Sequence, residues 1–557
     1  MNRLFLFIFS LVIVANFPNT LIGKQKTAQP LTAETLFAPD RITDVEIQLD
    51  ESDWDKIRLQ GRVFSEALSK EMTENPFTYV KGNVSIDGAM IKNVGIRKKG
   101  FIGSLNNDRP SLKIKFSEYQ DQSPVKGLDR LTLNNNNQDA GRICQYLAYK
   151  LFRDSGTHAP RCGFAKVTVN GTYLGIYSNV EAIKSGFLEH SFGGKSGAVY
   201  EGTVTDFYPE YNKKFEQKNK QAKSKYISAV TEVLRSEELD LEELETLVDV
   251  DSFIKFWAME SLIGFWDGYC SNQNNYYLYR DSKSKKFQFI PWGTDSAFTE
   301  SSPIPPFFIK PISVHAKAIL PNKLYRIDEV KTKYATTMMS FLDEHWNETK
   351  LLAEVDRVET LLSEHVLPEN KKSFSRTLLG YRKFIEARRE AIEEEFESGP
   401  PKLMAESKKP SYFLPIGEVT ATFKGIWCEK DPANPTNVGE VTVDLQVNGK
   451  AIKFESLGVY AKKDDRDPKS ASIIITGKSS ATGKTIIIAA GVPLTNFEPS
   501  DSSMNTGGAL IQPGTFGLIG MKFKMMFGSV QLKQASLTPG EEFEGTFTMA
   551  VGEFNMN

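Results

Sequence analysis

The chain has 557 residues, with 68 basic and 70 acidic side chains and a formal net charge of −2. Because the charges nearly cancel, the composition gives no support for binding to nucleic acid or to an anionic surface through overall charge. At roughly 150 residues per domain, the length predicts about two to four domains.

The first residues have the pattern of an export signal. A short cationic start precedes a nearly unbroken apolar run from Leu4 to Phe17. This run is shorter than the ~20 apolar residues that span a bilayer, so we predict a signal peptide over residues 1–23. A polar, flexible lead-in is expected over residues 24–40. The expected location is secreted, periplasmic or at the cell surface, and an uncleaved signal anchor is the one membrane attachment that the sequence suggests.

Residues 41–182 are predicted to form a β-rich lobe. Alternating apolar and polar residues dominate from Ile42 to Ile114, apart from a helix expected around Glu51 to Gln60. Asn170-Gly171 stands between two strand-like segments and predicts a hairpin turn. A helix is expected over about residues 140–153.

Residues 183–398 change to a helical pattern. Apolar residues recur at helical spacing over Lys223 to Arg235, Leu241 to Leu247 and Val250 to Phe265, and further helices are expected from about Pro321 to Glu397. These segments predict a mostly helical second lobe.

A linker is predicted over residues 399–411, where prolines and lysines accumulate. From residue 412 to 557 the composition shifts to Gly, Thr, Val, Ile and Phe, with turn residues about every ten positions. This pattern predicts an antiparallel β-sandwich or barrel. Such a domain would bind a surface, a polysaccharide or a partner, or would only pack on the preceding domain.

One polar pattern carries recognisable chemistry. Asp267 precedes Asn272 by five residues; two short strands, Tyr276 to Arg280 and Phe287 to Pro291, follow, and then comes Asp295. This order is the layout of a kinase-type phosphoryl-transfer site, in which one Asp accepts a hydroxyl proton while an Asn and a second Asp hold Mg²⁺. The alternative is that Asp and Asn only stabilise turns.

Several segments in the same order resemble one family. They are Val94 to Gly100, Arg109 to Phe116, Leu131 to Asn137, Val169 to Glu181, and Asp267 to Asp295. Over roughly residues 40 to 400 the chain resembles the spore-coat protein CotH family of atypical secreted protein kinases. The resemblance implies an α+β fold with a two-lobed, kinase-like domain over residues 41–398. It also implies ATP with Mg²⁺ or Mn²⁺, and transfer to Ser or Thr hydroxyls of a secreted or surface protein.

By position in the family motif, Asp267 would be the catalytic residue, and Asn272 and Asp295 would bind metal. Gly293 stands where the motif usually has its first acidic residue. Either Asp295 takes the metal-binding role or the site is impaired. We favour the first reading, because two residues along an extended chain point to the same side.

The nucleotide-binding half is predicted from basic and glycine residues. Lys113 and Lys115 alternate along one strand and so face the same side. We expect Lys113, ahead of Lys115, to neutralise phosphate charge, with Arg97 as a second cation. Gly100 opens a loop whose backbone could approach phosphates, although an ordinary hairpin turn is the alternative. Glu181 follows a strand at a position that resembles the hinge between lobes, where adenine would bind.

The helix over residues 140–153 lacks the glutamate that protein kinases pair with their phosphate-binding lysine, and its most plausible inward polar residue is Gln145. Glu181 and Glu201 are possible substitutes. Two other functions therefore stay open: a structural or adhesive surface protein on a degenerate kinase scaffold, and transfer of AMP instead of a phosphoryl group. The four cysteines form no Cys-x-x-Cys pair and are either bridged or free.

Overall fold

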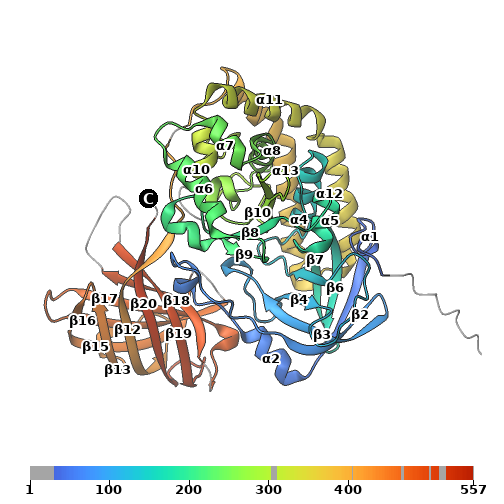
Figure 1. The fold of residues 1–557 in the computed structure, drawn as a ribbon. Helices are drawn as coiled ribbons and strands as arrows, with labels where there is room; N and C mark the ends of the chain where they lie inside the picture. The colour runs from blue at the N-terminus through green and yellow to red at the C-terminus, as the bar shows by residue number, and fades with distance from the viewer. Residues whose placement is uncertain are drawn as a thin grey trace, which may run out of the picture.

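The computed structural model describes residues 31–302, 310–403, 405–465, 469–500, 503–512 and 522–555. It consists of a β-rich lobe, a helical lobe above it and a separate β domain beside both (Figure 1). The predicted signal peptide, residues 1–23, lies outside the described residues. The predicted mixed fold with an all-β C-terminal domain is confirmed.

Seven strands of the first lobe form a closed barrel in the order β1-β2-β3-β4-β5-β7-β6. Their bounds are β1 Ile42–Gln48, β2 Val80–Ile86, β3 Ala89–Lys99, β4 Ser111–Lys115, β5 Arg130–Asn134, β6 Cys162–Val169 and β7 Thr172–Val180. The barrel closes through a parallel pairing of β1 with β6. Alternate apolar residues of these strands fill its interior, which explains the period-two pattern of the sequence.

The local predictions for this lobe agree with the structure. Helix α2 spans Glu51–Leu59, and a two-residue turn at Asn170 and Gly171 joins β6 to β7. Both turn residues have positive φ, +48° and +82°, as a type I′ turn requires. Short helix α3 spans Phe64–Ala67.

Residues 31–40 differ from the flexible lead-in that was expected. They contain a short helix, α1 (Ala33–Leu36), whose side chains at Ala33 and Leu36 are buried. The side chains and backbones of Thr32 and Thr35 cap its first turn reciprocally. Apolar burial and capping together fix this segment against the barrel.

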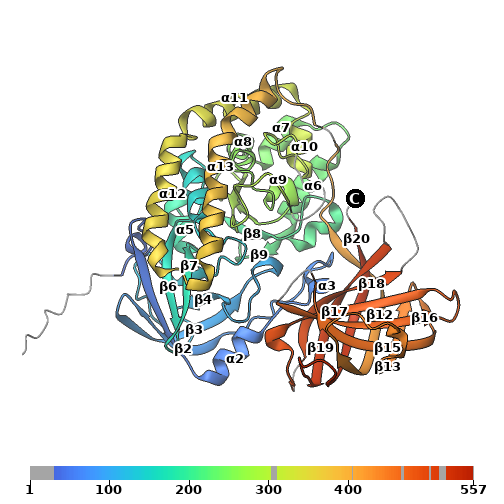
Figure 2. The same cartoon turned by 180° about the vertical axis from the view of Figure 1, so that it is seen from behind.

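The second lobe is mostly helical (Figure 2). Its helices are α5 Ser185–Phe192, α6 Ser224–Arg235, α7 Leu241–Leu247, α8 Val250–Leu262, α9 Tyr269–Asn272, α10 Ile319–Leu324, α11 Asp328–Glu344, α12 Glu348–Leu362 and α13 Lys371–Phe396. They surround a small sheet of order β11-β10-β8-β9. Its strands are β8 Ala198–Gly202, β9 Glu216–Gln217, β10 Tyr276–Arg280 and β11 Phe287–Pro291. The predicted hairpin of β10 and β11 is confirmed.

Helix α4 (Cys144–Asp154) connects the lobes, because it follows β5 in the chain but packs into the apolar core of the helical lobe. It contacts both β6 and α8. Nearly all its side chains are buried, including Gln145 at 1% exposure.

The described residues beyond 411 form one large, mainly antiparallel sheet that closes on itself. Its strands are β12 Tyr412–Trp427, β13 Glu440–Val447, β14 Lys450–Ile452, β15 Phe454–Lys463, β16 Ser470–Ser479, β17 Thr485–Pro493, β18 Met504–Gln512, β19 Lys522–Gln534 and β20 Glu542–Asn555. β12 pairs with β20 along most of its length, and a short parallel pairing with β15 closes the ring. Of the two predicted forms, the structure has the barrel.

Candidate active site

Asp267 lies in the turn between α8 and α9, and asparagine side chains hold its carboxylate. Nδ2 of Asn272 and of Asn274 donate to Oδ1 at 2.7 and 3.1 Å, and Nδ2 of Asn275 donates to Oδ2 at 2.8 Å. Burial raises the pKa of Asp267 to about 6, although these three hydrogen bonds oppose the rise. The residue is therefore largely ionised at neutral pH and suited to accept a hydroxyl proton.

A buried glutamate supports this turn from beneath. Glu260 on α8 accepts the backbone N–H groups of Tyr269 and Cys270, at 3.0 and 2.8 Å, in the first turn of α9. Its carboxyl group thus fixes the start of the short helix that carries Asn272. Burial raises the pKa of Glu260 to about 7, because the two backbone hydrogen bonds only partly compensate for lost hydration.

Asp295 follows β11 and faces the same region as Asp267. Burial raises the pKa of Asp295 to about 7; the ammonium of Lys99 lowers it and the carboxylate of Asp267 raises it further. Two buried carboxylates that repel each other are a suitable site for a divalent cation, which would keep both ionised.

Gly293 has a structural reason to be glycine. Its φ is +52°, and a β-carbon there would lie 2.6 Å from Oδ1 of Asn275. Since Asn275 also holds Asp267, the space that a side chain at residue 293 would need is taken by a residue that supports the candidate catalytic carboxylate. Only Asp295 remains to supply the second carboxylate from this motif.

A basic group lies on strands β3 and β4. Arg97 pairs with Lys113 across the two strands, and Lys99 lies two residues further along β3 on the same face. Burial lowers the pKa of Lys113 well below its usual range, and the neighbouring Arg97 lowers it further. Burial lowers that of Lys99 to about 8, against the influence of Asp295 and Glu201. An anionic ligand would favour the charged form of both lysines.

Glu201 on β8 is the acidic neighbour of these cations. It forms a 2.7 Å ion pair with Lys218 and lies within the electrostatic influence of Lys113. Burial would raise its pKa, but Lys218 and then Lys113 lower it to about 2. Of the two glutamates that the sequence offered as partners of the phosphate-binding lysine, Glu201 is the one under the influence of Lys113, although its ion pair is with Lys218.

The structure separates Lys115 from this basic group. Lys115 forms a 2.6 Å ion pair with Glu118 beside its own strand. Gly100 has φ +138°, and a β-carbon there would lie 2.7 Å from Oγ of Ser104, so glycine is required. The loop continues as a single 3₁₀ turn, Ile102–Ser104, whose last two carbonyl groups accept Asn137 and Asn135 side chains.

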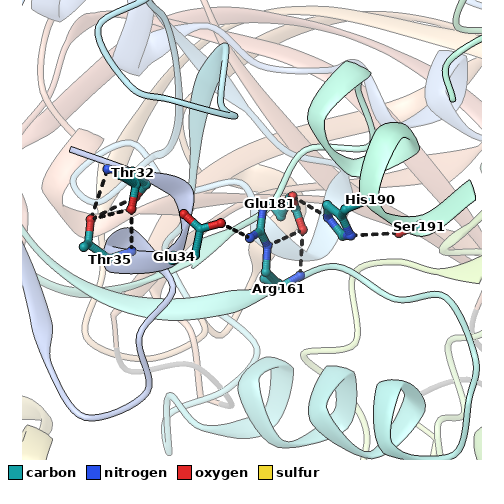
Figure 3. A network of polar contacts seen from close by, with 7 residues as sticks. All are labelled: Thr32, Glu34, Thr35, Arg161, Glu181, His190 and Ser191. Atoms are coloured by element: carbon teal, nitrogen blue, oxygen red, sulfur yellow. Dashed lines mark hydrogen bonds and ion pairs between the residues drawn. The ribbon is translucent and has the colours of Figure 1, made fainter. Parts of the chain in front are cut away.

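Glu181 does not join the candidate site. It lies at the end of β7, where Arg161 holds its carboxylate at 2.6 and 3.0 Å and His190 bonds to it at 3.0 Å (Figure 3). Burial would raise its pKa, but His190 and Arg161 lower it below its usual value. The carboxylate is 1% exposed, so the expected contact of this side chain with adenine has no support in the geometry.

Helix α4 reaches the site through its first residue rather than through Gln145. Sγ of Cys144 donates to the backbone oxygen of Thr294 at 3.0 Å, next to Asp295. Tyr149, five residues further along α4, lies within the electrostatic influence of Asp295. All four cysteines are free. The contacts of Cys144 and Tyr149 indicate that α4 packs beside the segment that carries Asp295.

The residues fit the expected Mg²⁺ and ATP by their chemistry. Asp267, Asn272 and Asp295 offer hard oxygen atoms, and the basic side chains of Lys99, Lys113 and Arg97 suit a polyphosphate. Among the described residues no group of three or more His, Cys, Asp and Glu side chains has the arrangement of a metal site. The candidate site has two carboxylates and one amide.

Comparison with known proteins identifies the family. Residues 88–397 match the family described as CotH kinase protein. The chain belongs to the CotH kinase family. The sequence is 24% identical over 214 residues to inner spore coat protein H of Bacillus subtilis, covering 35% of this chain and 57% of that protein. It is 23% identical over 193 residues to invasin CotH2 of Rhizopus delemar, covering 31% and 32%.

The CotH chain described here thus spans about a third to somewhat over half of these relatives. A solved structure, the Helicobacter pylori proinflammatory kinase CtkA, matches with 14% identity over 54% of this chain and 96% of that chain, at a TM-score of 0.26. The kinase-family assignment therefore rests on the sequence match. Within the described residues, no helix is both long and apolar enough to cross a membrane.

Sequence reasoning missed Lys99 and Asn275. Lys99 could have been found, since it follows Arg97 by two residues and alternation places both on one face. Asn275 gave no such signal, because its role depends on the return of β11 beside it. Lys218 gave no such signal either. It follows β9, and only the pairing of β9 with β8 brings it next to Glu201.

Proposed function

We propose that this CotH family member is an exported, ATP- and Mg²⁺-dependent protein kinase that phosphorylates Ser or Thr hydroxyls of secreted or surface proteins. Asp267 would orient the acceptor hydroxyl and take its proton. Asn272 and Asp295 would hold Mg²⁺, or Mn²⁺, against the phosphates, which is the chemistry a bound metal would supply. Lys113, Lys99 and Arg97 would neutralise phosphate charge.

The observation that carries this proposal is the convergence of two charge groups. The carboxylate of Asp267 raises the pKa of Asp295, and the carboxylates of Asp295 and Glu201 raise the pKa of Lys99. Glu201 in turn influences Lys113. These influences support a shared region for the carboxylates and the basic side chains, as phosphoryl transfer requires.

Relatives named spore coat protein and invasin support a surface or coat location and keep a structural or adhesive role as the second candidate. Transfer of AMP uses the same metal and nucleotide groups and is a third outcome. We propose no nucleic-acid partner. Membrane attachment is proposed only through an uncleaved signal anchor, and the C-terminal β domain is proposed to contact a surface or polysaccharide.

The decisive experiment incubates the purified full chain with labelled ATP and Mg²⁺, with and without candidate acceptors, and identifies modified residues by mass spectrometry. Added masses of phosphate and of AMP distinguish the two transfer reactions. Asp267→Ala and Asp295→Asn should abolish transfer, while Asp343→Ala, an exposed aspartate on α11, should not.

A thermal-shift titration separates the enzyme from the scaffold. MgATP at 100 times its Kd should stabilise the native state by about 2.7 kcal/mol. Absence of both a shift and a transfer product at millimolar MgATP would leave the structural role as the better account.

A further inference from the structure

An apolar cluster joins the C-terminal β domain to the kinase domain. We call it the interdomain cluster, and its members are Phe64, Leu68, Phe101, Ile102, Val204, Phe413, Met525, Phe527, Ala550 and Phe554. The rings of Phe64 on α3 and Phe527 on β19 stack with centroids 4.0 Å apart. At the same place the backbone N–H of Phe413 donates to the carbonyl of Leu68 at 2.9 Å. Figure 2 shows α3 between the first lobe and the β domain.

The first segment of the candidate site that the cluster contacts is the loop that begins at Gly100. Phe101 and Ile102 directly follow Gly100, and both pack against the cluster. Arg62 lies 5.9 Å from the ring centroid of Phe101, and its Nε donates to the carbonyl of Gly100 at 3.2 Å. Phe101 and Ile102 therefore anchor this loop against the β domain.

The second segment leads to the catalytic carboxylate. Val204, two residues beyond β8, contributes its side chain to the cluster, while its N–H donates to Oδ1 of Asn274 at 3.2 Å. The same amide group donates to Oδ1 of Asp267 at 3.1 Å. A continuous run of contacts thus extends from the β domain to Asp267.

Val204 adopts an unfavourable backbone conformation to make these contacts. Its φ is +44°, in the left-handed region that a β-branched residue rarely occupies. Such strain persists only where the surroundings impose it. Here the apolar cluster holds the side chain and Asn274 holds the N–H.

The linker adds a second route to the same loop. The carbonyl of Lys408 accepts Nε2 of Gln273 at 3.3 Å, and its N–H donates to the carbonyl of Lys317 at 2.8 Å. The N–H of Lys317 in turn donates to the carbonyl of Cys270 at 2.8 Å. Residues on both sides of Asn272 are therefore tied to the chain that leads into the β domain.

We propose that the C-terminal β domain positions two segments of the candidate active site, holding the loop after Gly100 through Phe101 and Ile102 and setting Asp267 through Val204 and Asn274. Val204 and Phe413 are positioning residues in this scheme. The inference rests on the proposed function for its kinetic consequences. Its structural content does not depend on catalysis.

The kinetic test uses Val204→Gly, which removes the apolar contact but suits a positive φ. Misplaced catalytic groups lose roughly tenfold to a hundredfold in rate, so we expect kcat to fall by at least about tenfold. The KM for ATP should stay within about twofold of the wild-type value. Val204→Ile, which keeps an apolar side chain at this position, should have the wild-type kcat. Lys285→Gly, at φ +63° in the exposed turn between β10 and β11, is the matched control and should change neither. A wild-type kcat for Val204→Gly would overturn the proposal.

Hydrogen exchange tests the same coupling without an activity. Phe413→Ala in the full chain should speed amide exchange in residues 100–105 and 267–275, but not in 328–396. Phe497→Ala changes the barrel core and not the interdomain cluster. It should loosen the barrel and leave amide exchange in residues 100–105 and 267–275 unchanged. If Phe413→Ala unfolds the barrel, Val204→Gly replaces it, since that residue belongs to the kinase domain. Unchanged exchange in both segments overturns the proposal, whereas faster exchange in a chain without transfer activity overturns only the kinase function.

Discussion

The side-chain oxygen of Asn275 lies 2.6 Å from the point that a β-carbon on Gly293 would occupy. The same side chain donates to the carboxylate of Asp267 at 2.8 Å. The departure from the family motif at residue 293 is thus coupled to the way this chain holds its candidate catalytic residue. A glycine and an asparagine have taken up the space that an acidic side chain fills in the usual motif.

Introducing the usual acidic residue should therefore impair the site rather than improve it. Gly293→Asp and Gly293→Ala both place a β-carbon against Asn275 at φ +52°, so we expect transfer to fall by roughly tenfold or more. The left-handed backbone alone should cost about 1–2 kcal/mol of stability. Kinetics and thermal unfolding measure both effects.

Gly171→Ala is the control for that pair. Its φ is +82°, and a β-carbon there meets no atom within 4 Å. It should lose similar stability with unchanged activity. Higher activity in Gly293→Asp than in the wild type would contradict our account of residue 293.

The basic group on β3 and β4 should contribute to nucleotide binding and should lower the stability of the nucleotide-free protein. Lys113→Met and Lys99→Met remove charge-assisted contacts worth about 1.5–3 kcal/mol each, which predicts a Kd for MgATP raised about tenfold to a hundredfold. Because Lys113 is desolvated, its replacement by an apolar side chain should leave the free protein as stable as before or more so. Calorimetric titration and chemical unfolding provide the two measurements.

Lys115→Met is the matched control on the same strand. Its ammonium pairs with Glu118, so the Kd should stay within about twofold of wild type. A loss of nucleotide affinity at Lys115 equal to that at Lys113 would show that the two lysines were assigned wrongly.

Glu201 and Glu216 offer a second matched pair, since both carboxylates lie 2.7 Å from Lys218. The Glu201 side chain is 21% exposed and that of Glu216 is 49% exposed. Glu201→Gln removes the more buried of the two counter-charges of Lys218 and should lose about 1–3 kcal/mol of stability. Glu216→Gln should change stability by less than about 0.5 kcal/mol. Equal effects in urea unfolding would argue against a special role for Glu201.

Glu260 should make stability fall as pH rises. Its pKa is about 7 in the folded chain against an ordinary value of 4.5, so the folded state holds the proton more tightly than the unfolded state. This contribution is complete below about pH 4.5 and is lost as pH rises through about 7, and it amounts to roughly 3 kcal/mol. Unfolding free energies at pH 5 and pH 8 should therefore differ by less in Glu260→Gln than in the wild type. Glu245→Gln, exposed on α7, should keep the wild-type difference.

Local sequence signals predicted the turns and hairpins whose conformation depends on neighbouring residues. The turn at Asn170 and Gly171 follows from residues that tolerate positive φ. The hairpin after Asp267 follows from two short aromatic-rich runs on either side of a polar turn. The preference for Lys113 is consistent with its place opposite Arg97 and under the influence of Glu201. By contrast, Glu181 looked like a hinge residue, but Arg161 and His190 occupy its carboxylate, and neither is predictable as a partner from spacing along the chain.

The amino-acid sequence by itself determined the two-lobed organisation, the family and the order Asp267, Asn272, Asp295, because periodicity and motif spacing are properties of neighbouring residues. Only the tertiary structure decided that Asn275 lies against residue 293, and that Val204 joins the C-terminal barrel to the turn that carries Asp267. These contacts depend on where separate strands and domains meet, and that is set by packing over the whole chain rather than by any local pattern.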